Sequence, residues 1–188
     1  MSTASVPADD RIITGEELAR MGDLGRCELV DGRIVRMSPT GYRHGDIEAR
    51  IAEALGTFVR PRKLGRVLTG EVGLYTRRNP DRVRGADVLF ITNETYERRT
   101  PGMAYLDVAP ELVVEVLSPD DRAVEVNQKL REYFAIGVRQ VWVADPEACS
   151  VSAYRSPTDV SEFRETDRLS GGDILPGFEV AVAALFEE

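Results

Sequence analysis

Apolar residues recur at a helical spacing in two segments of the chain. Because positions three and four residues apart lie on one face of a helix, each segment predicts an amphipathic helix. We expect the first helix to end at Pro61 and the second at Gly137, since proline lacks a backbone N–H and glycine accepts the left-handed conformation of a helix end. The two apolar stripes consist of Ile47, Ile51, Leu55, Phe58 and Val59, and of Ala123, Val126, Leu130, Tyr133 and Phe134.

Short runs that are almost entirely apolar predict strands buried on both faces, over residues 86–92, 111–117 and 139–144. Asp31-Gly32 predicts a two-residue hairpin turn, and Thr14 with Glu17 predicts the capping box of a short first helix. Weaker strand patterns cover residues 27–30, 33–37, 66–69, 72–76, 150–154 and 162–166. This order indicates an α/β fold with a mixed central β-sheet flanked by helices, preceded by an N-terminal helix and a β-hairpin.

Composition narrows the class of protein. The 188 residues are 43% apolar and 30% charged, as in a globular domain. We expect a flexible tail over residues 1–11 and a single domain over residues 12–188. No apolar run approaches the roughly 20 residues of a membrane span. The absence of a signal-peptide pattern and the two distant cysteines favour a cytoplasmic location.

Charge is unevenly distributed along the chain. The net charge of −8 argues against binding nucleic acid through overall basicity. Between Arg60 and Arg84, however, eight bases outnumber two acids. This segment is either a solvated hairpin of an arginine-rich chain or a surface that contacts the phosphate backbone. In the second interpretation, the nucleic-acid contacts are Arg77, Arg78, Arg82 and Arg84.

Two acids lie inside apolar strands, Asp87 in the 86–92 run and Glu115 in the 111–117 run. An ionised carboxylate in such a place costs several kcal/mol unless it is paired, protonated or bound to a cation. The pair therefore indicates either a metal site or buried ion pairs with arginines. Lys129, one of only two lysines beside 22 arginines, lies on the flank of the second helical stripe. It either pairs with Glu125 one turn earlier or extends its ammonium group to Glu115.

Three further residues are candidates for the same site, each with an ordinary alternative. Glu28 is either a hairpin residue or an acid on the metal side, and Glu71 is either a turn acid or part of the same cleft. His44, the only histidine, is either a cap or core residue or a member of the site. A single histidine excludes zinc or haem sites built from several histidines. The sequence also has no phosphate-binding loop and no nucleophile elbow of serine hydrolases.

Short motifs follow one another from about Thr14 to Phe186. They are Glu28-Leu-Val-Asp-Gly32, Met37-Ser-Pro-Thr40, His44, Asp87-Val, Pro110-Glu-Leu-Val-Val-Glu-Val-Leu-Ser-Pro119, Lys129 with Tyr133, Gly137-Val, Val143-Ala-Asp-Pro146 and Leu175-Pro-Gly-Phe178. In this order and spacing they resemble the Uma family of putative restriction endonucleases, a branch of the PD-(D/E)XK nuclease superfamily.

The resemblance implies a restriction-endonuclease-like fold that hydrolyses phosphodiester bonds of DNA. It assigns Asp87 and Glu115 as metal-binding acids and Lys129 as the catalytic ammonium group. Leu117 stands where the superfamily usually has its lysine, so the lysine must come from the following helix. Ala86 replaces a usual proline. That proline mainly stiffens the strand entry, and its absence is no reason to expect inactivity.

Oxygen ligands suit Mg²⁺, with Mn²⁺ as a substitute, and the main-chain carbonyl of Val116 would complete the set with Asp87 and Glu115. The alternative is a catalytically inactive binding or assembly protein on the same fold, in which the acids and Lys129 form a buried network. We expect DNA as partner, no membrane, and a homodimer built on exposed strand edges and the apolar segment from Val180 to Phe186.

Overall fold

The computed structural model describes residues 11–187. The expected tail therefore lies outside the described residues, except for Arg11, whose guanidinium pairs with Glu17. The elements in chain order are α1 (Gly15–Arg20), β1 (Cys27–Val30), β2 (Arg33–Arg36), α2 (Tyr42–Arg62), β3 (Gly65–Arg77), β4 (Arg82–Thr92), α3 (Asn93–Glu97), β5 (Leu112–Val116), α4 (Ala123–Ile136), β6 (Gln140–Asp145), β7 (Ser150–Ser156), β8 (Asp159–Arg164), β9 (Arg168–Ser170), β10 (Glu179–Ala181) and α5 (Ala183–Phe186).

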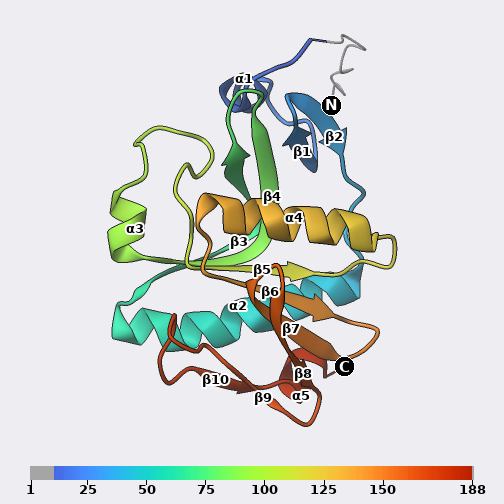
Figure 1. Ribbon diagram of the computed structural model, residues 1–188, viewed down its shortest axis with the longest axis vertical. Helices are drawn as coiled ribbons and strands as arrows, with labels where there is room; N and C mark the ends of the chain where they lie inside the picture. The colour runs from blue at the N-terminus through green and yellow to red at the C-terminus, as the bar shows by residue number, and fades with distance from the viewer. Residues whose placement is uncertain (1–10, 188) are drawn as a thin grey trace.

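An eight-stranded sheet forms the centre of the molecule. Its strands follow the order β2-β1-β4-β5-β6-β7-β8, and β3 pairs with the other edge of β4. β5 and β6 run parallel and are joined through α4, whereas the other neighbours are antiparallel. The predicted mixed sheet, flanked by helices and preceded by a short helix and a hairpin, is confirmed (Figure 1).

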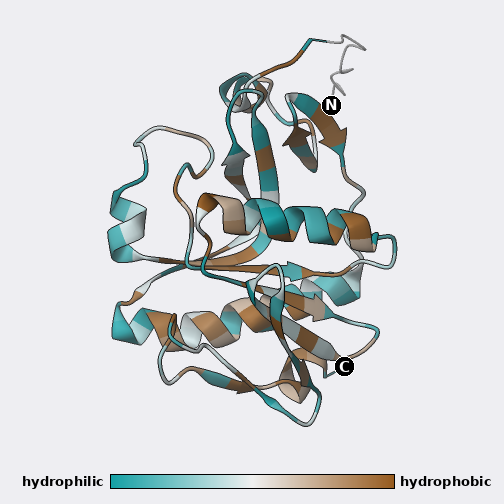
Figure 2. Ribbon diagram, in the orientation of Figure 1, coloured by the Kyte–Doolittle hydropathy of each residue, from teal (hydrophilic) through white to brown (hydrophobic). Residues whose placement is uncertain are grey.

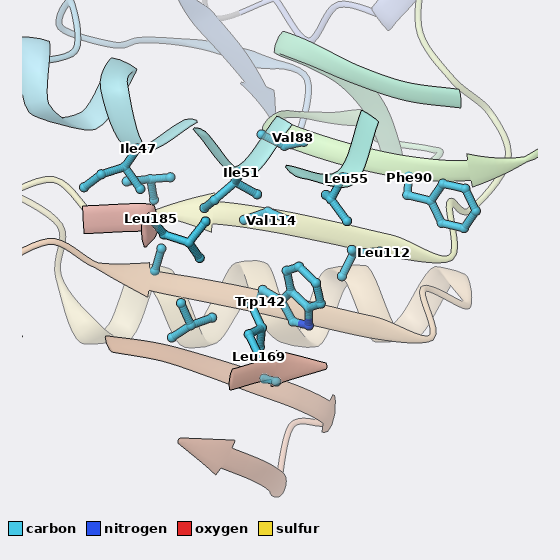
Figure 3. Close-up of a cluster of buried hydrophobic side chains, with 14 of the residues drawn as sticks. Ile47, Ile51, Leu55, Val88, Phe90, Leu112, Val114, Trp142, Leu169 and Leu185 are labelled. Carbon is cyan, nitrogen blue, oxygen red and sulfur yellow. The ribbon is translucent and has the colours of Figure 1, made fainter. Parts of the chain in front are cut away.

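The two long helices lie on opposite sides of β5 and β6 (Figure 1). On the α2 side, the predicted stripe packs against β4, β5, β6 and the C-terminal segment in the larger core cluster (Figure 3). On the α4 side, Leu130 and Tyr133 pack against the other face of the same strands. Both strand faces are therefore covered, which explains why the strand sequences are almost uninterrupted apolar runs (Figure 2).

One edge of β4 pairs with β3, and the other edge is divided between β1 and β5. β3 pairs with β4 from Arg82 to Thr92 and occupies one edge along its whole length. On the other edge, β1 pairs at Val83, and β5 pairs from Val88 to Phe90. A gap in the hydrogen-bond ladder therefore remains between Val83 and Val88. Asp87 lies in this gap.

The structure corrects two predicted boundaries. The helix expected to end at Pro61 continues to Arg62 and is capped by Lys63 at φ 53°, so the proline lies inside its last turn. The strands expected over residues 66–69 and 72–76 are one strand, β3, because the pairing with β4 resumes after a register shift between Thr69 and Val72.

The apolar C-terminal segment is part of the chain's own core. Val182, Leu185 and Phe186 are buried in the larger cluster beside α2. These three side chains are covered within the chain, whereas Ala184 is exposed, and the homodimer expected on this segment stays a prediction. β8 is the edge strand beyond β7.

Within residues 11–187, no helix is both long enough and apolar enough to cross a membrane.

Candidate metal centre and active site

Two side-chain carboxylates take over hydrogen bonds that the sheet lacks in the gap along β4. Asp87 Oδ2 accepts the N–H of Val116 on β5 at 2.7 Å. Glu28 Oε1, on β1, accepts the N–H of Gly85 at 3.2 Å. Buried backbone N–H groups need such partners. The interrupted ladder therefore explains why two acids lie between strands. Because Asp87 accepts the N–H of Val116, its carboxylate lies beside the residue that follows Glu115.

The side chain of Glu115 faces α4. Its Oε2 accepts from Lys129 Nζ at 2.7 Å, and its Oε1 accepts from the Tyr133 hydroxyl at 2.6 Å. Lys129 Nζ also lies 3.5 Å from Glu28 Oε1. The lysine on the flank of the helix thus reaches the end of the strand, as one of the two interpretations of the sequence required. Tyr133, expected only as a core residue, contributes a polar contact as well.

Burial and neighbouring charges shift the pKa values of Glu115 and Lys129 in opposite directions. Burial raises the pKa of Glu115 to about 7, against the charge of Lys129. Burial alone would lower the pKa of Lys129, but the charges of Glu115 and Glu28 raise it above its ordinary value. Lys129 is therefore an ammonium group throughout the neutral range. It can donate hydrogen bonds and positive charge but cannot act as a base.

Asp87 itself faces α2. His44 Nε2 lies 3.3 Å from Asp87 Oδ2, and Glu48, one helical turn after His44, joins them in a group whose ligand atoms all lie within 4.8 Å of one another. Burial alone would raise the pKa of Asp87, but hydrogen bonds from His44 and from the N–H of Val116 hold it below its ordinary value. These three side chains could hold a metal ion.

Glu71 approaches Asp87 from a bulge in β3. The register shift between Thr69 and Val72 places Glu71 at φ 58°, and Gly85 opposite leaves room for its carboxylate, because a Cβ there would lie 2.9 Å from Glu71 Oε2. Burial and then the charge of Asp87 raise the pKa of Glu71 to about 7. Arg26 forms an ion pair with Glu71 and lies 4.0 Å from Asp87 Oδ1. Glu71 is thus a bulge acid whose carboxylate lies beside Asp87.

A separate cluster holds the buried arginines of β4. Arg82 and Arg84 are each 8% exposed, and both pair with Glu132 of α4. Arg84 also donates to Glu28 Oε2 at 2.6 Å. We call these four residues the arginine cluster. The expectation that Arg82 and Arg84 contribute to an exposed phosphate-contacting surface is therefore corrected, since their guanidinium groups are enclosed and fully engaged with carboxylates.

Arg77 and Arg78 differ from the two buried arginines. Their side chains are 43% and 46% exposed. Arg77 pairs with Asp31, and Arg78 pairs with Glu16 and Asp81. Both guanidinium groups lie on the surface, and their partners Asp31 and Glu16 are partly exposed, whereas Asp81 is buried.

A cleft of about 270 Å³ opens beside Glu115, between the β1–β2 hairpin and α4. Glu28, Glu115 and Lys129 contribute its polar lining, whereas Val35 and Met37 contribute apolar lining from the hairpin side. Solvent and a ligand can therefore reach the lysine side of the site from this cleft.

Three residues of this region were not predicted from the sequence, namely Glu48, Arg26 and Tyr133 through its hydroxyl. Glu48 had a detectable signal, because an acid four residues after the only histidine lies on the same helix face. Arg26 lies in the loop before β1 and had no such signal, since the loop brings it to the site only in the folded chain.

Comparison with protein-family models matches residues 16–183 to the Uma2 model, described as "Putative restriction endonuclease". This match covers most of the chain. The chain belongs to the Uma2 family. A comparison with curated proteins finds no match.

Among solved structures, the Uma2 chain is similar to a crystal structure described as a putative nuclease belonging to DUF820 from Anabaena variabilis ATCC 29413. The TM-score is 0.78 at 18% sequence identity, and the similarity covers 93% of this chain and 97% of the other. The nuclease-like fold expected from the sequence is therefore confirmed.

Proposed function

We propose that the protein is a metal-dependent endonuclease that hydrolyses phosphodiester bonds of DNA. The observation that carries this proposal is the position of Asp87 and Glu115. The two buried acids lie on neighbouring strands at the gap in the ladder, with the ammonium group of Lys129 2.7 Å from Glu115. Membership in a family of putative restriction endonucleases supports it.

The donor set fits a small divalent cation. Asp87, Glu115 and the Val116 carbonyl would hold Mg²⁺, which prefers oxygen ligands, with Mn²⁺ as a substitute. Leu117 N–H donates to Ala144 on the β6 side. Successive residues of a strand point their backbone groups to alternate sides, so the carbonyl of Val116 faces the β4 side, where Asp87 lies. The bound cation would lower the pKa of a water molecule and neutralise charge on the phosphate.

The residues of the chain supply the remaining functions. Lys129 stays protonated and donates to an oxygen of the attacked phosphate or to the attacking water. Tyr133 and Lys129 together fix both oxygens of Glu115. Arg77, the last residue of β3, and Arg78 directly after it are exposed and would contact the phosphate backbone. Because such contacts release counterions from the phosphates, the affinity for DNA should fall as the salt concentration rises.

Plasmid nicking tests this proposal. Purified protein is incubated with supercoiled DNA and Mg²⁺, Mn²⁺ or EDTA, beside Asp87→Asn, Glu115→Gln and Lys129→Met, which keep the size of each side chain. Arg131→Met is the matched control for Lys129→Met, since Arg131 is an exposed base on the same helix. We expect metal-dependent nicking that each site variant reduces by roughly a hundredfold or more and the control retains. Full nicking by all three site variants would exclude this site.

A second candidate function rests on the saturation of Glu115. Both of its carboxylate oxygens already accept short hydrogen bonds, from Lys129 and from Tyr133. This arrangement favours a non-catalytic binding or assembly protein in which acids and lysine form a buried network. Thermal melting with added Mg²⁺ or Mn²⁺ separates the two functions, because a cation that binds only the folded protein raises the melting temperature. If the protein has this non-catalytic function, added metal should leave its melting temperature unchanged and plasmid DNA should not be nicked.

A further inference from the structure

Basic residues gather where the end of α2, the start of β3 and α3 meet. Residues 60–66 carry four bases and no acid, and residues 93–99 carry two bases and two acids, in a chain whose net charge is −8. The start of β3 pairs with the end of β4, and the Asn93 side chain donates to the main-chain carbonyl of Lys63 at 2.8 Å (Figure 1). We call five of these residues the basic face, four of them exposed and the last half-buried: Arg62, Lys63, Arg66, Arg98 and Arg99.

The charges of the basic face are not paired with acids. Among residues 11–187, its four arginines donate to uncharged acceptors, namely two main-chain carbonyls, an amide and a hydroxyl, at 2.8–3.2 Å. Four arginines around the β3–β4 turn all form ion pairs instead, namely Arg77, Arg78, Arg82 and Arg84. The positive charge of the basic face is therefore available to an anionic ligand.

Two of the guanidinium groups are held in place by one aromatic ring. Cζ of Arg66 lies 3.8 Å from the ring centroid of Tyr96, and Cζ of Arg99 lies 3.7 Å from it. Two planar groups this close to one ring cannot share a face, so they flank the ring on opposite faces. Stacking of this kind restricts long side chains, and less conformational entropy is then lost on binding. A fixed guanidinium group can contact phosphate oxygens through two parallel N–H bonds.

The basic face is distant from the candidate metal centre. Arg62 follows His44 by eighteen residues on α2, which at 1.5 Å per residue corresponds to about 27 Å. One strand of a duplex advances about 3.4 Å per nucleotide, so a contact at the basic face lies about eight nucleotides from a bond cleaved beside Asp87. The basic face can therefore hold DNA but does not touch the reacting phosphate.

We propose that the basic face binds the sugar–phosphate backbone of DNA, as a surface separate from Arg77 and Arg78. The inference rests on the proposed nuclease for the identity of the anion, and it adds the surface that holds the DNA away from the cleaved bond. Four of the five bases are arginines, the residue best suited to phosphates of nucleic acid. Because backbone phosphates are the same at every position, this surface would hold DNA regardless of its sequence.

Fluorescence anisotropy with a labelled DNA duplex in EDTA tests the basic face without cleavage. The triple variant Arg62→Gln/Arg66→Gln/Arg99→Gln is compared with the wild type between about 50 and 200 mM KCl. We expect its affinity to fall roughly tenfold or more at the lower salt, and the dependence of log affinity on log salt to become shallower by about 2.7, or about 0.9 for each lost contact. The matched control replaces by Gln three exposed arginines that are paired with acids, namely Arg155, Arg164 and Arg168, and should keep both values.

Arginine labelling of the wild type gives a second readout, which holds even where the triple variant fails to fold. Phenylglyoxal modifies exposed guanidinium groups, and mass spectrometry identifies the modified residues. We expect the duplex to protect Arg62, Arg66 and Arg98 and to leave Arg164, whose side chain is 75% exposed, unprotected. Equal labelling of all four with and without DNA would overturn the proposal, as would an unchanged affinity and salt dependence in a folded triple variant.

The nuclease and the basic face can fail separately. Plasmid nicking by the wild type, with unchanged duplex binding by the triple variant, would overturn the basic face and leave the nuclease standing. Loss of duplex binding in the triple variant, without nicking by the wild type, would support the basic face and count against the nuclease. Sedimentation with vesicles of phosphatidylcholine and phosphatidylserine, without binding to the duplex, would overturn the proposal and identify an anionic lipid surface as the ligand.

Discussion

Two groups of buried charge lie along the same strand, and they differ in how their carboxylates are paired. In the arginine cluster, Glu132 accepts from Arg84 at 2.7 and 3.0 Å and also from Arg82, and Gln128 adds another hydrogen bond at 2.9 Å. On the α2 side, Asp87 has Arg26 at 4.0 Å and His44 at 3.3 Å as its side-chain partners. Both groups are enclosed by protein, but only the first has cations matched to its acids.

This difference separates a structural use of buried acids from a ligand-binding one. A paired and fully hydrogen-bonded charge is tolerated in the interior. Removing one partner leaves the other as an unpaired buried charge, which lowers the free energy of unfolding. Acids without matched cations repel one another and gain from an added cation. Burial of an acid alone, which is all that the strand sequences indicate, does not distinguish the two cases.

The largest expected effect comes from breaking the arginine cluster. Glu132→Ala leaves Arg82 and Arg84 buried without their shared partner, and we expect it to lower the free energy of unfolding by about 3–5 kcal/mol. Urea unfolding at pH 7 measures this. Glu125→Ala, at an exposed acid of the same helix, is the control and should change stability by less than about 0.5 kcal/mol. An equal loss of stability in both variants would contradict a structural role for the buried ion pairs of Glu132.

Asp87→Asn, unlike Glu132→Ala, should change the free energy of unfolding little. The amide oxygen can still accept the N–H of Val116. The loss of repulsion on Glu71 offsets the loss of the contacts that hold the pKa of Asp87 low, so we expect stability without metal to change by less than about 1 kcal/mol. Added Mn²⁺ at about 100 times its dissociation constant should stabilise the wild type by about 2.7 kcal/mol and the variant little. Melting curves with and without metal measure both quantities. A loss without metal as large as that of Glu132→Ala would show that Asp87 is structural.

Tyr133→Phe sharpens the comparison on the α4 side. The variant keeps the buried ring and removes only the hydroxyl that donates to Glu115 at 2.6 Å. We expect a loss of about 1–2 kcal/mol, because a hydrogen bond to a charged group is lost but Lys129 still pairs with the acid. Urea unfolding measures it, with Tyr154→Phe as the matched control on β7. A loss no larger than that of the control would mean that the hydroxyl contributes packing alone.

Most of the fold followed from local patterns. The stripe on α2, the hairpin turn and the apolar strands depend on spacing between near neighbours, and the core is built on them. The interruption predicted inside β3 was wrong because Gly70 and Glu71 adopt positive φ in a bulge that β4 continues to pair across. The pattern recorded the bulge but could not show that pairing resumes after it.

The site was predictable only in part, because its contacts join distant segments. The sequence placed Asp87 and Glu115 inside apolar strands and left open whether Lys129 pairs with Glu125 or reaches Glu115. The structure brings Lys129 to Glu115. Neither Glu132, about fifty residues after the arginines it neutralises, nor Arg26 could be matched to a partner from spacing. Which buried acids are already paired is the property that decides function, and it is determined by tertiary contacts.

The smallest expected effect is a pH dependence confined to the arginine cluster. Burial alone would raise the pKa of Glu132, but hydrogen bonds and charge from Arg84 hold it below its ordinary value. A carboxyl with a lowered pKa in the folded state adds stability above its unfolded pKa and loses it as the pH falls through the folded value. The stability difference between wild type and Glu132→Gln should therefore be constant from pH 7 to about 5 and shrink below about 4.5. Urea unfolding across this range measures it. A difference that grew toward acid pH would mean that Glu132 is already protonated at neutrality and that the arginines hold a neutral partner.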